Sequence, residues 1–228
     1  MTIISKNTKR SNLVQDRLIL HLNQQSYKFS NRQLSIFFII SPILCIFIYF
    51  FLSLRMNYWI YEFTSSFITF FLNLFFNLNA QVIAYPEHDI FPSIFIPNHP
   101  FDGSYAITVN CIAGHIFSFM IGVILLVPSS RNGSINKEFG WRKIKVLLIS
   151  TFGIFLLNVF RIIFLLYFNF KGIEFEIIHE SLFFLSAVIG ALFFFIVLEH
   201  WLPELFISIY YLYRLVSQKT SKKLDFKK

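Results

Sequence analysis

Three polar residues that could carry chemistry lie inside or beside long apolar runs of this sequence: Cys111, Arg161 and His179. A cysteine thiol becomes a nucleophile when a base removes its proton, and a histidine is the usual base. An arginine can bind a carboxylate, or it can stabilise the oxyanion that develops when a carbonyl group is attacked. Together the three residue types indicate cysteine-dependent acyl transfer, with Cys111 as the nucleophile, His179 as the base and Arg161 in the electrostatic role.

The surroundings of each residue favour this interpretation over simpler ones. We expect Cys111 to begin an apolar helix over residues 112–128, where the positive end of the helix macrodipole favours a thiolate. Arg161 lies in an apolar run, where insertion of an arginine costs about 2.5–3.5 kcal/mol, and Asn158 adds a second polar group one turn earlier. The simpler alternatives are a small buried cysteine, an arginine that extends to the lipid headgroups, and a solvated histidine.

Other polar residues are weaker candidates. His115 follows Cys111 by four residues, so on a continuous helix it would share the face of the cysteine and compete with His179 as the base. Cys45 lies within an apolar run and is expected to pack against lipid or another helix. We expect no cofactor and no metal, because one loop group has no known metal-ligand spacing: His88, Asp89, His99 and Asp102.

The composition indicates a membrane protein. Of the 228 residues 56% are hydrophobic and only 14% are charged, whereas soluble domains contain about 25% charged residues. A chain of this size could not bury so much apolar surface in water. The net charge of +8 comes from basic residues in both tails and in one short loop. This distribution is typical of cytoplasmic segments next to lipid, and it argues against a nucleic-acid partner.

The hydrophobic pattern predicts an all-α integral membrane fold. It predicts a bundle of four transmembrane helices: residues 34–54, 112–128, 144–168 and 180–202. Residues 57–78 carry a polar stripe at helical spacing and are expected to form an amphipathic helix on the outer face. The stripe consists of Glu62, Ser66, Thr69, Asn73 and Asn77. Residues 79–110 form an external loop, in which β-prone stretches over 93–96 and 105–109 could pair as a small hairpin.

The basic residues determine the expected topology. Residues 56–110 contain no lysine or arginine, so the positive-inside rule places this stretch outside and the basic segments inside. Four crossings satisfy every basic segment, whereas a fifth crossing at 57–78 would put one basic tail outside. The chain then divides into a cytoplasmic basic N-terminal region (1–33), a membrane-embedded domain (34–202) and a cytoplasmic basic tail (203–228). We expect the plasma (inner) membrane as its location, with the site at the outer face.

The order of these residues resembles the exosortase/archaeosortase superfamily. The matching features are a cysteine at a helix start (Cys111), an N-x-x-R motif in the next membrane helix (residues 158–161), and a histidine that opens the helix after it (His179). Upstream, an amphipathic stretch with Leu72-Asn73 and a short β-prone loop also resemble compact members of the family. The resemblance covers roughly residues 34–202. The family often has glycine two residues after the cysteine, where this chain has Ala113 followed by Gly114.

The resemblance implies a membrane-embedded cysteine transpeptidase or protease. Such enzymes act on membrane-tethered precursors that end in a short motif, a transmembrane segment and a basic tail, and they transfer the cleaved protein to a surface acceptor. By resemblance Cys111 is the nucleophile, Arg161 the oxyanion or positioning residue and His179 the general acid/base, while membrane lipids surround the enzyme. Two other classes stay open at this point: a non-enzymatic scaffold for surface-polymer assembly or export, and a small transporter or channel subunit.

Overall fold

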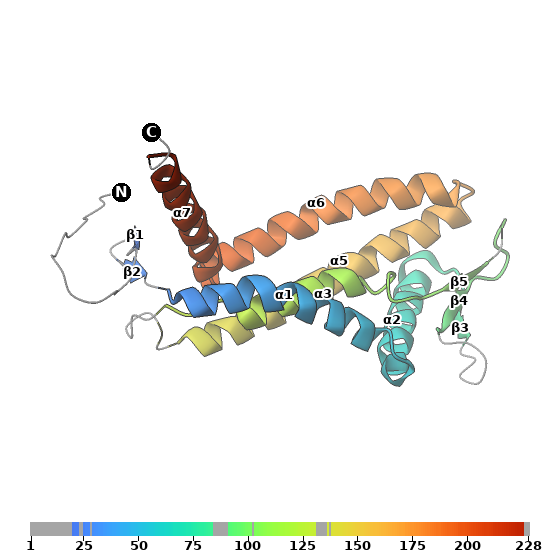
Figure 1. Ribbon diagram of the computed structural model, residues 1–228. Helices are drawn as coiled ribbons and strands as arrows, with labels where there is room; N and C mark the ends of the chain where they lie inside the picture. The colour runs from blue at the N-terminus through green and yellow to red at the C-terminus, as the bar shows by residue number, and fades with distance from the viewer. Residues whose placement is uncertain are drawn as a thin grey trace.

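The fold is a helical bundle with a small sheet at one end (Figure 1). The computed structural model describes residues 20–22, 25–27, 29–83, 91–101, 103–130, 136 and 138–225. Four helices lie lengthwise in the bundle: α1 (Asn31–Leu52), α3 (Gly114–Leu126), α5 (Phe139–Phe170) and α6 (Phe175–Trp201). The sheet and α2 (Tyr58–Phe76) lie at one end, called here the sheet end, and α7 (Glu204–Asp225) leaves the other end.

Among the described residues, three helices are long and apolar enough to cross a membrane: α1, α5 and α6. They correspond to three of the four predicted apolar helices, with α5 and α6 beginning about five residues earlier than predicted. The fourth, α3, has only 13 residues, which corresponds to about 20 Å and is shorter than the ~30 Å hydrocarbon core of a bilayer. The segment before α3 is a turn rather than a helix, so the predicted span 112–128 is shortened at both ends.

The lengthwise helices expose much of their apolar surface. Phe47 of α1 is 66% exposed and Phe184 of α6 is 73% exposed, and many of their neighbours on the same helices are also exposed. A protein in water does not leave so large a contiguous apolar surface uncovered. The three long helices and this surface are therefore compatible with a transmembrane protein.

A close helix crossing holds α3 against α1. A Cβ atom on Gly122 would lie 2.5 Å from Cys45 Sγ and 3.2 Å from the Cys45 backbone nitrogen, so only glycine allows the two backbones to approach this closely. The Cys45 thiol contacts the Phe119 carbonyl at 3.7 Å. Cys45 therefore faces a helix and not lipid alone, which decides between the two packing roles expected for it.

The predicted β-hairpin is confirmed and is part of a larger sheet. Strands β4 (Ser93–Phe95) and β5 (Ser104–Ala106) pair antiparallel, and β3 (Gln81–Ile83) pairs with the other edge of β4. A second two-stranded sheet, β1 (Leu20–Leu22) and β2 (Gln25–Tyr27), precedes α1. Most of the predicted N-terminal region 1–33 lies outside the described residues.

The amphipathic segment 57–78 forms the short helix η1 (Arg55–Asn57) followed by α2. Helix α2 crosses the end of α1 (Figure 1) and packs along the C-terminal half of α5 through ring contacts, from Phe63 against Phe155 to Phe76 against Tyr167. Its polar residues do not form a single solvent-facing stripe, because Thr69 is buried. The helix exposes polar and apolar side chains together, as expected of a helix that meets both lipid and water.

Two asparagines end α2 and attach it to the sheet. The Asn73 amide donates to the Ala80 carbonyl at 2.9 Å, and its oxygen accepts from the Ala80 backbone N–H at 2.6 Å. The Asn73 side chain thus forms the pair of hydrogen bonds with Ala80 that a neighbouring strand would form. Asn77 ends the helix in the left-handed conformation with φ 52°, which asparagine tolerates better than most residues.

The C-terminal segment 203–228 begins as a packed helix. Glu204 is fully buried and pairs with Arg142 of α5 at 2.6 Å. Tyr211, on the next turns of α7, packs with Phe29 and Leu34 from the start of the chain. The first turns of α7 therefore belong to the folded body, because a buried carboxylate with a partner and a buried tyrosine fix them to it.

We predict that α2 does not cross the bilayer, so that both its ends lie on one side. Met56 and Asn79 flank α2 and are exposed. In a Cys45→Ala, Cys111→Ala background, Met56→Cys and Asn79→Cys should both react with a membrane-impermeant maleimide added outside. Asn136→Cys, in the basic loop, should react only after permeabilisation. If the first two positions react from opposite sides, the four-crossing topology is wrong.

Candidate active site

Cys111 lies in an irregular turn at the sheet end of the bundle. The turn covers residues 109–113, and α3 begins only at Gly114. The prediction that Cys111 begins the helix was therefore wrong by three residues, because the chain needs a turn to pass from the sheet into α3. The thiol is free and half-buried. Its Sγ lies 3.5 Å from Thr108 Oγ1 and 3.7 Å from the Ala106 carbonyl, so it faces β5.

Two small residues allow this turn. Ala113 has a left-handed backbone with φ 58°, a conformation that glycine adopts without cost and alanine does not. The Gly114 N–H donates to the Val109 carbonyl at 2.9 Å, and a Cβ at Gly114 would lie only 2.6 Å from Val109 Cγ2. The glycine that the resemblance expects at position 113 would thus fit the backbone found there.

Asn158 fixes the position of the turn against α5. Its side chain is buried, and its amide Nδ2 donates a hydrogen bond to the Cys111 carbonyl. Cys111 packs at the edge of the buried cluster formed by α2, the sheet and α5, whereas Ala113 belongs to the cluster between α1, α3, α5, α6 and α7. Asn158 therefore acts as a positioning residue where the two packed regions of the bundle meet.

Arg161 lies one turn after Asn158 and on the same side of α5. Its Nε atom is buried and makes no hydrogen bond to the described residues. The guanidinium lies 5.8 Å above the ring of Phe183, a favourable but weak cation–π contact. It also interacts electrostatically with Cys111 and with His115. The fold thus brings Cys111, Asn158 and Arg161 into one region.

His179 occupies the centre of an aromatic face on α6. It stacks with Phe175 at 5.6 Å and with Phe183 at 6.3 Å, because residues four apart on a helix share a face. Phe175 in turn stacks on Tyr105 of β5 at 6.0 Å, and Phe183 lies beneath Arg161. The face that carries His179 is therefore in contact with Tyr105 of β5 and with Arg161 of α5, although no hydrogen bond joins the described His179 and Cys111 side chains.

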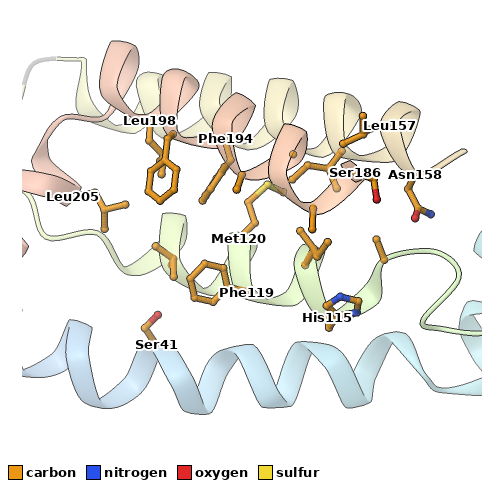
Figure 2. Close-up of a pocket in the computed structure, with 18 of the residues that line it drawn as sticks. Ser41, His115, Phe119, Met120, Leu157, Asn158, Ser186, Phe194, Leu198 and Leu205 are labelled. Atoms are coloured by element: carbon orange, nitrogen blue, oxygen red, sulfur yellow. The ribbon is translucent and has the colours of Figure 1, made fainter. Parts of the chain in front are cut away.

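His115 approaches Arg161 from α3. Because Cys111 lies outside α3, the two residues do not share a helix face, contrary to the spacing argument. His115 lines one end of a cavity of about 630 Å³ together with Asn158 and Arg161. Figure 2 shows His115 and Asn158 at the same end of this cavity. His115 is thus a second histidine near the guanidinium, on the cavity side of it.

A hydrogen-bonded chain that the sequence did not reveal supports the site from the sheet. The His99 Nδ1 atom accepts from the Phe101 N–H at 3.1 Å, so in the neutral ring Nε2 carries the proton and donates to Tyr105 Oη at 3.0 Å. Tyr105 Oη then donates to Asn169 Oδ1, and Asn169 Nδ2 donates to the Ile173 carbonyl at 2.9 Å. This chain connects β5 with the turn between α5 and α6.

These hydrogen bonds also bear on whether the loop residues could bind a metal ion. Both ring nitrogens of His99 have hydrogen-bond partners, so His99 has a structural role beside the sheet. The other loop residues considered as ligands, His88, Asp89 and Asp102, lie outside the described residues. Within the described part of the chain, no group of three His, Cys, Asp or Glu side chains could hold a metal ion.

Comparison of the chain with models of protein families, with curated proteins and with solved structures finds no match.

We predict opposite effects for two adjacent substitutions in the turn. Gly114→Ala should lower the free energy of unfolding by about 1–3 kcal/mol, because the new methyl group collides with Val109. Ala113→Gly should leave it unchanged or raise it, because glycine removes a left-handed strain of about 1 kcal/mol. Thermal unfolding of the purified protein in detergent, followed by tryptophan fluorescence, measures both. A wild-type melting temperature for Gly114→Ala would contradict the close approach of the two backbones.

Proposed function

We propose that this chain is a membrane-embedded cysteine transpeptidase of the exosortase type. It would cleave the C-terminal sorting signals of secreted proteins at the outer face and transfer the products to a surface acceptor. The observation that supports the proposal most is the position of Arg161. Its guanidinium has an unused Nε, lies over Phe183 on the face of α6 that carries His179, and interacts electrostatically with the free thiol of Cys111. A structural role alone does not require a guanidinium with an unused donor in an apolar bundle.

The residues take complementary roles in this proposal. His179 accepts the proton of the Cys111 thiol, and the thiolate attacks the carbonyl carbon of the scissile peptide bond. The negative charge that develops on the carbonyl oxygen is stabilised by the Arg161 guanidinium. The Nε atom of this guanidinium is free to donate, because no described residue accepts a hydrogen bond from it. When the tetrahedral intermediate collapses, the C–N bond breaks and His179 returns its proton to the leaving amine. The product is a thioester on Cys111.

The thioester is then resolved by an acceptor. An amine or hydroxyl group from a surface molecule attacks the thioester carbonyl, His179 takes its proton, and the Cys111 thiolate leaves and regains a proton. Water in the same position gives hydrolysis. The position of the thiol at the end of apolar helices favours a substrate that is itself tethered in the bilayer, in agreement with a precursor that ends in a transmembrane segment and a basic tail.

For His179 to exchange a proton with the thiol, α6 must come closer to the turn that carries Cys111. Helix α6 packs chiefly against α5. Catalytic hydrogen bonds are often long or absent in an enzyme without substrate. Cys111 Sγ faces the Ala106 carbonyl of β5, and the neighbouring Tyr105 stacks on Phe175, on the α6 face that carries His179. This contact supports His179 as the base.

The second candidate function is a non-enzymatic scaffold for surface-polymer assembly or export. It is favoured by the absence of a hydrogen bond between the described Cys111 and His179 side chains, which leaves the site unassembled. In a scaffold Cys111 would be replaceable by another small residue, whereas acyl transfer requires its sulfur atom.

We predict that Cys111→Ala abolishes precursor processing and Cys45→Ala does not. Both residues are free, half-buried thiols, so each substitution removes one sulfur atom from a similar environment. The assay follows cleavage of a secreted precursor from the same genome that ends in a shared motif, an apolar span and a basic cluster, at matched enzyme levels. Mass spectrometry of the wild-type enzyme should also reveal a hydroxylamine-sensitive acyl group on Cys111. Normal processing by Cys111→Ala would support the scaffold.

We predict that His179→Gln reduces processing by about 10²–10⁴-fold, the usual loss for a general base, and that His115→Gln reduces it far less. Glutamine keeps a polar side chain of similar size but cannot take up a proton at neutral pH. The same precursor assay, with the pH dependence of the rate as a second measurement, compares the two variants. If His115→Gln gives the large loss, the base lies on α3 and the aromatic face of α6 has only a structural role.

A further inference from the structure

The cavity beside the site extends far beyond the residues that the proposed reaction needs. Its polar end contains His115, Asn158 and Ser186, and its other end contains Leu198 and Leu205, as Figure 2 shows. Its walls come from α1, α3, α5, α6 and α7. The cavity therefore runs along the bundle from the thiol end toward α7.

The dimensions of the cavity indicate the shape of its occupant. Along α6 the lining extends from Phe183 to Leu198, a rise of about 22 Å at 1.5 Å per residue. A volume of about 630 Å³ spread over that length gives a mean cross-section of roughly 30 Å². The cavity is thus long and narrow, and it has room for an extended hydrocarbon chain.

The charge distribution of the lining indicates the polar group of the occupant. Arg161 is the one lining residue with a permanent charge, and it lies at the polar end with its Nε atom unused. The rest of the lining is largely aliphatic and aromatic. A lone guanidinium at the end of an apolar channel matches an amphiphile with an anionic group, because phosphate and arginine form strong charge-assisted hydrogen bonds.

We propose that this cavity binds one acyl chain of an anionic phospholipid, whose phosphate lies beside Arg161. The chain enters between α3 and α6, which lack the close contact that joins α6 to α5. The lipid headgroup is then held next to the turn that carries Cys111. The lipid site shares Arg161 with the proposed reaction, but lipid binding is measured without a precursor, so the two proposals are tested separately.

The test uses phosphatidylglycerol with a photoactivatable diazirine on its acyl chain and the purified full-length protein in detergent. Labelled peptides should come from the cavity walls on α3 and α6. Ala191→Trp places a large ring in the cavity and should reduce this labelling about tenfold, the ratio expected when 1.4 kcal/mol of binding free energy is lost. Leu192→Trp, on the adjacent exposed position outside the lining, should label like the wild type.

The headgroup is tested separately. Arg161→Gln should weaken labelling by phosphatidylglycerol and leave labelling by diacylglycerol of the same acyl chain, which carries no phosphate, nearly unchanged. Equal labelling of Ala191→Trp and Leu192→Trp would mean that the lipid binds only to the outside of the bundle, and the proposal would be wrong. It would also be wrong if a helical apolar peptide with a diazirine labelled the cavity walls and phosphatidylglycerol did not.

Discussion

The hydrogen bond from the Asn158 amide to the Cys111 carbonyl sets the position of the whole site. In an apolar bundle every backbone polar group needs a partner within the protein, because lipid offers none. The carbonyl of Cys111 lies in a turn and has no helical partner there, so a side chain from α5 must supply the donor. Once Asn158 does so, the rotation of α5 is fixed, and Arg161 is directed to the same region one turn later.

Arg161 is held at an energetic disadvantage that a purely structural residue would avoid. Within the described residues, the Arg161 charge interacts favourably with the ring of Phe183 and with Cys111. A protonated His115 would repel it, because both groups are then positive. By contrast, Arg142 in the same helix meets a buried carboxylate in a well-formed pair with Glu204. The two arginines thus differ: Arg142 completes the fold, whereas Arg161 has an Nε donor that no described residue engages.

The sequence predicted the parts of this structure that depend on composition and periodicity. Long apolar runs determine α1, α5 and α6, and the β-prone stretches determine the hairpin, because these signals are local. The convergence of Cys111, Asn158 and Arg161 could be inferred because the apolar runs restrict where polar side chains can lie. The start of α3 could not be predicted, since it depends on the left-handed Ala113 and on the contact between Gly114 and Val109. The chain through His99, Tyr105 and Asn169 depends on distant contacts that no local pattern reveals.

The unequal lengths of the helices explain why the thiol lies where it does. Helix α5 has 32 residues and α3 has 13, so α5 continues toward the sheet beyond the point where α3 begins. The connection between β5 and α3 must therefore run along the side of α5 as irregular backbone. Irregular backbone in an apolar bundle is tolerated only where it is buried in protein or lines a cavity, and here α2, the sheet and α5 supply that cover. A longer α3 would have placed Cys111 in a regular helix and directed its carbonyl to its own helix. Because α3 is short, the Cys111 carbonyl accepts a hydrogen bond from Asn158 and not from its own helix. Arg161 then lies beside the turn, at one end of the cavity.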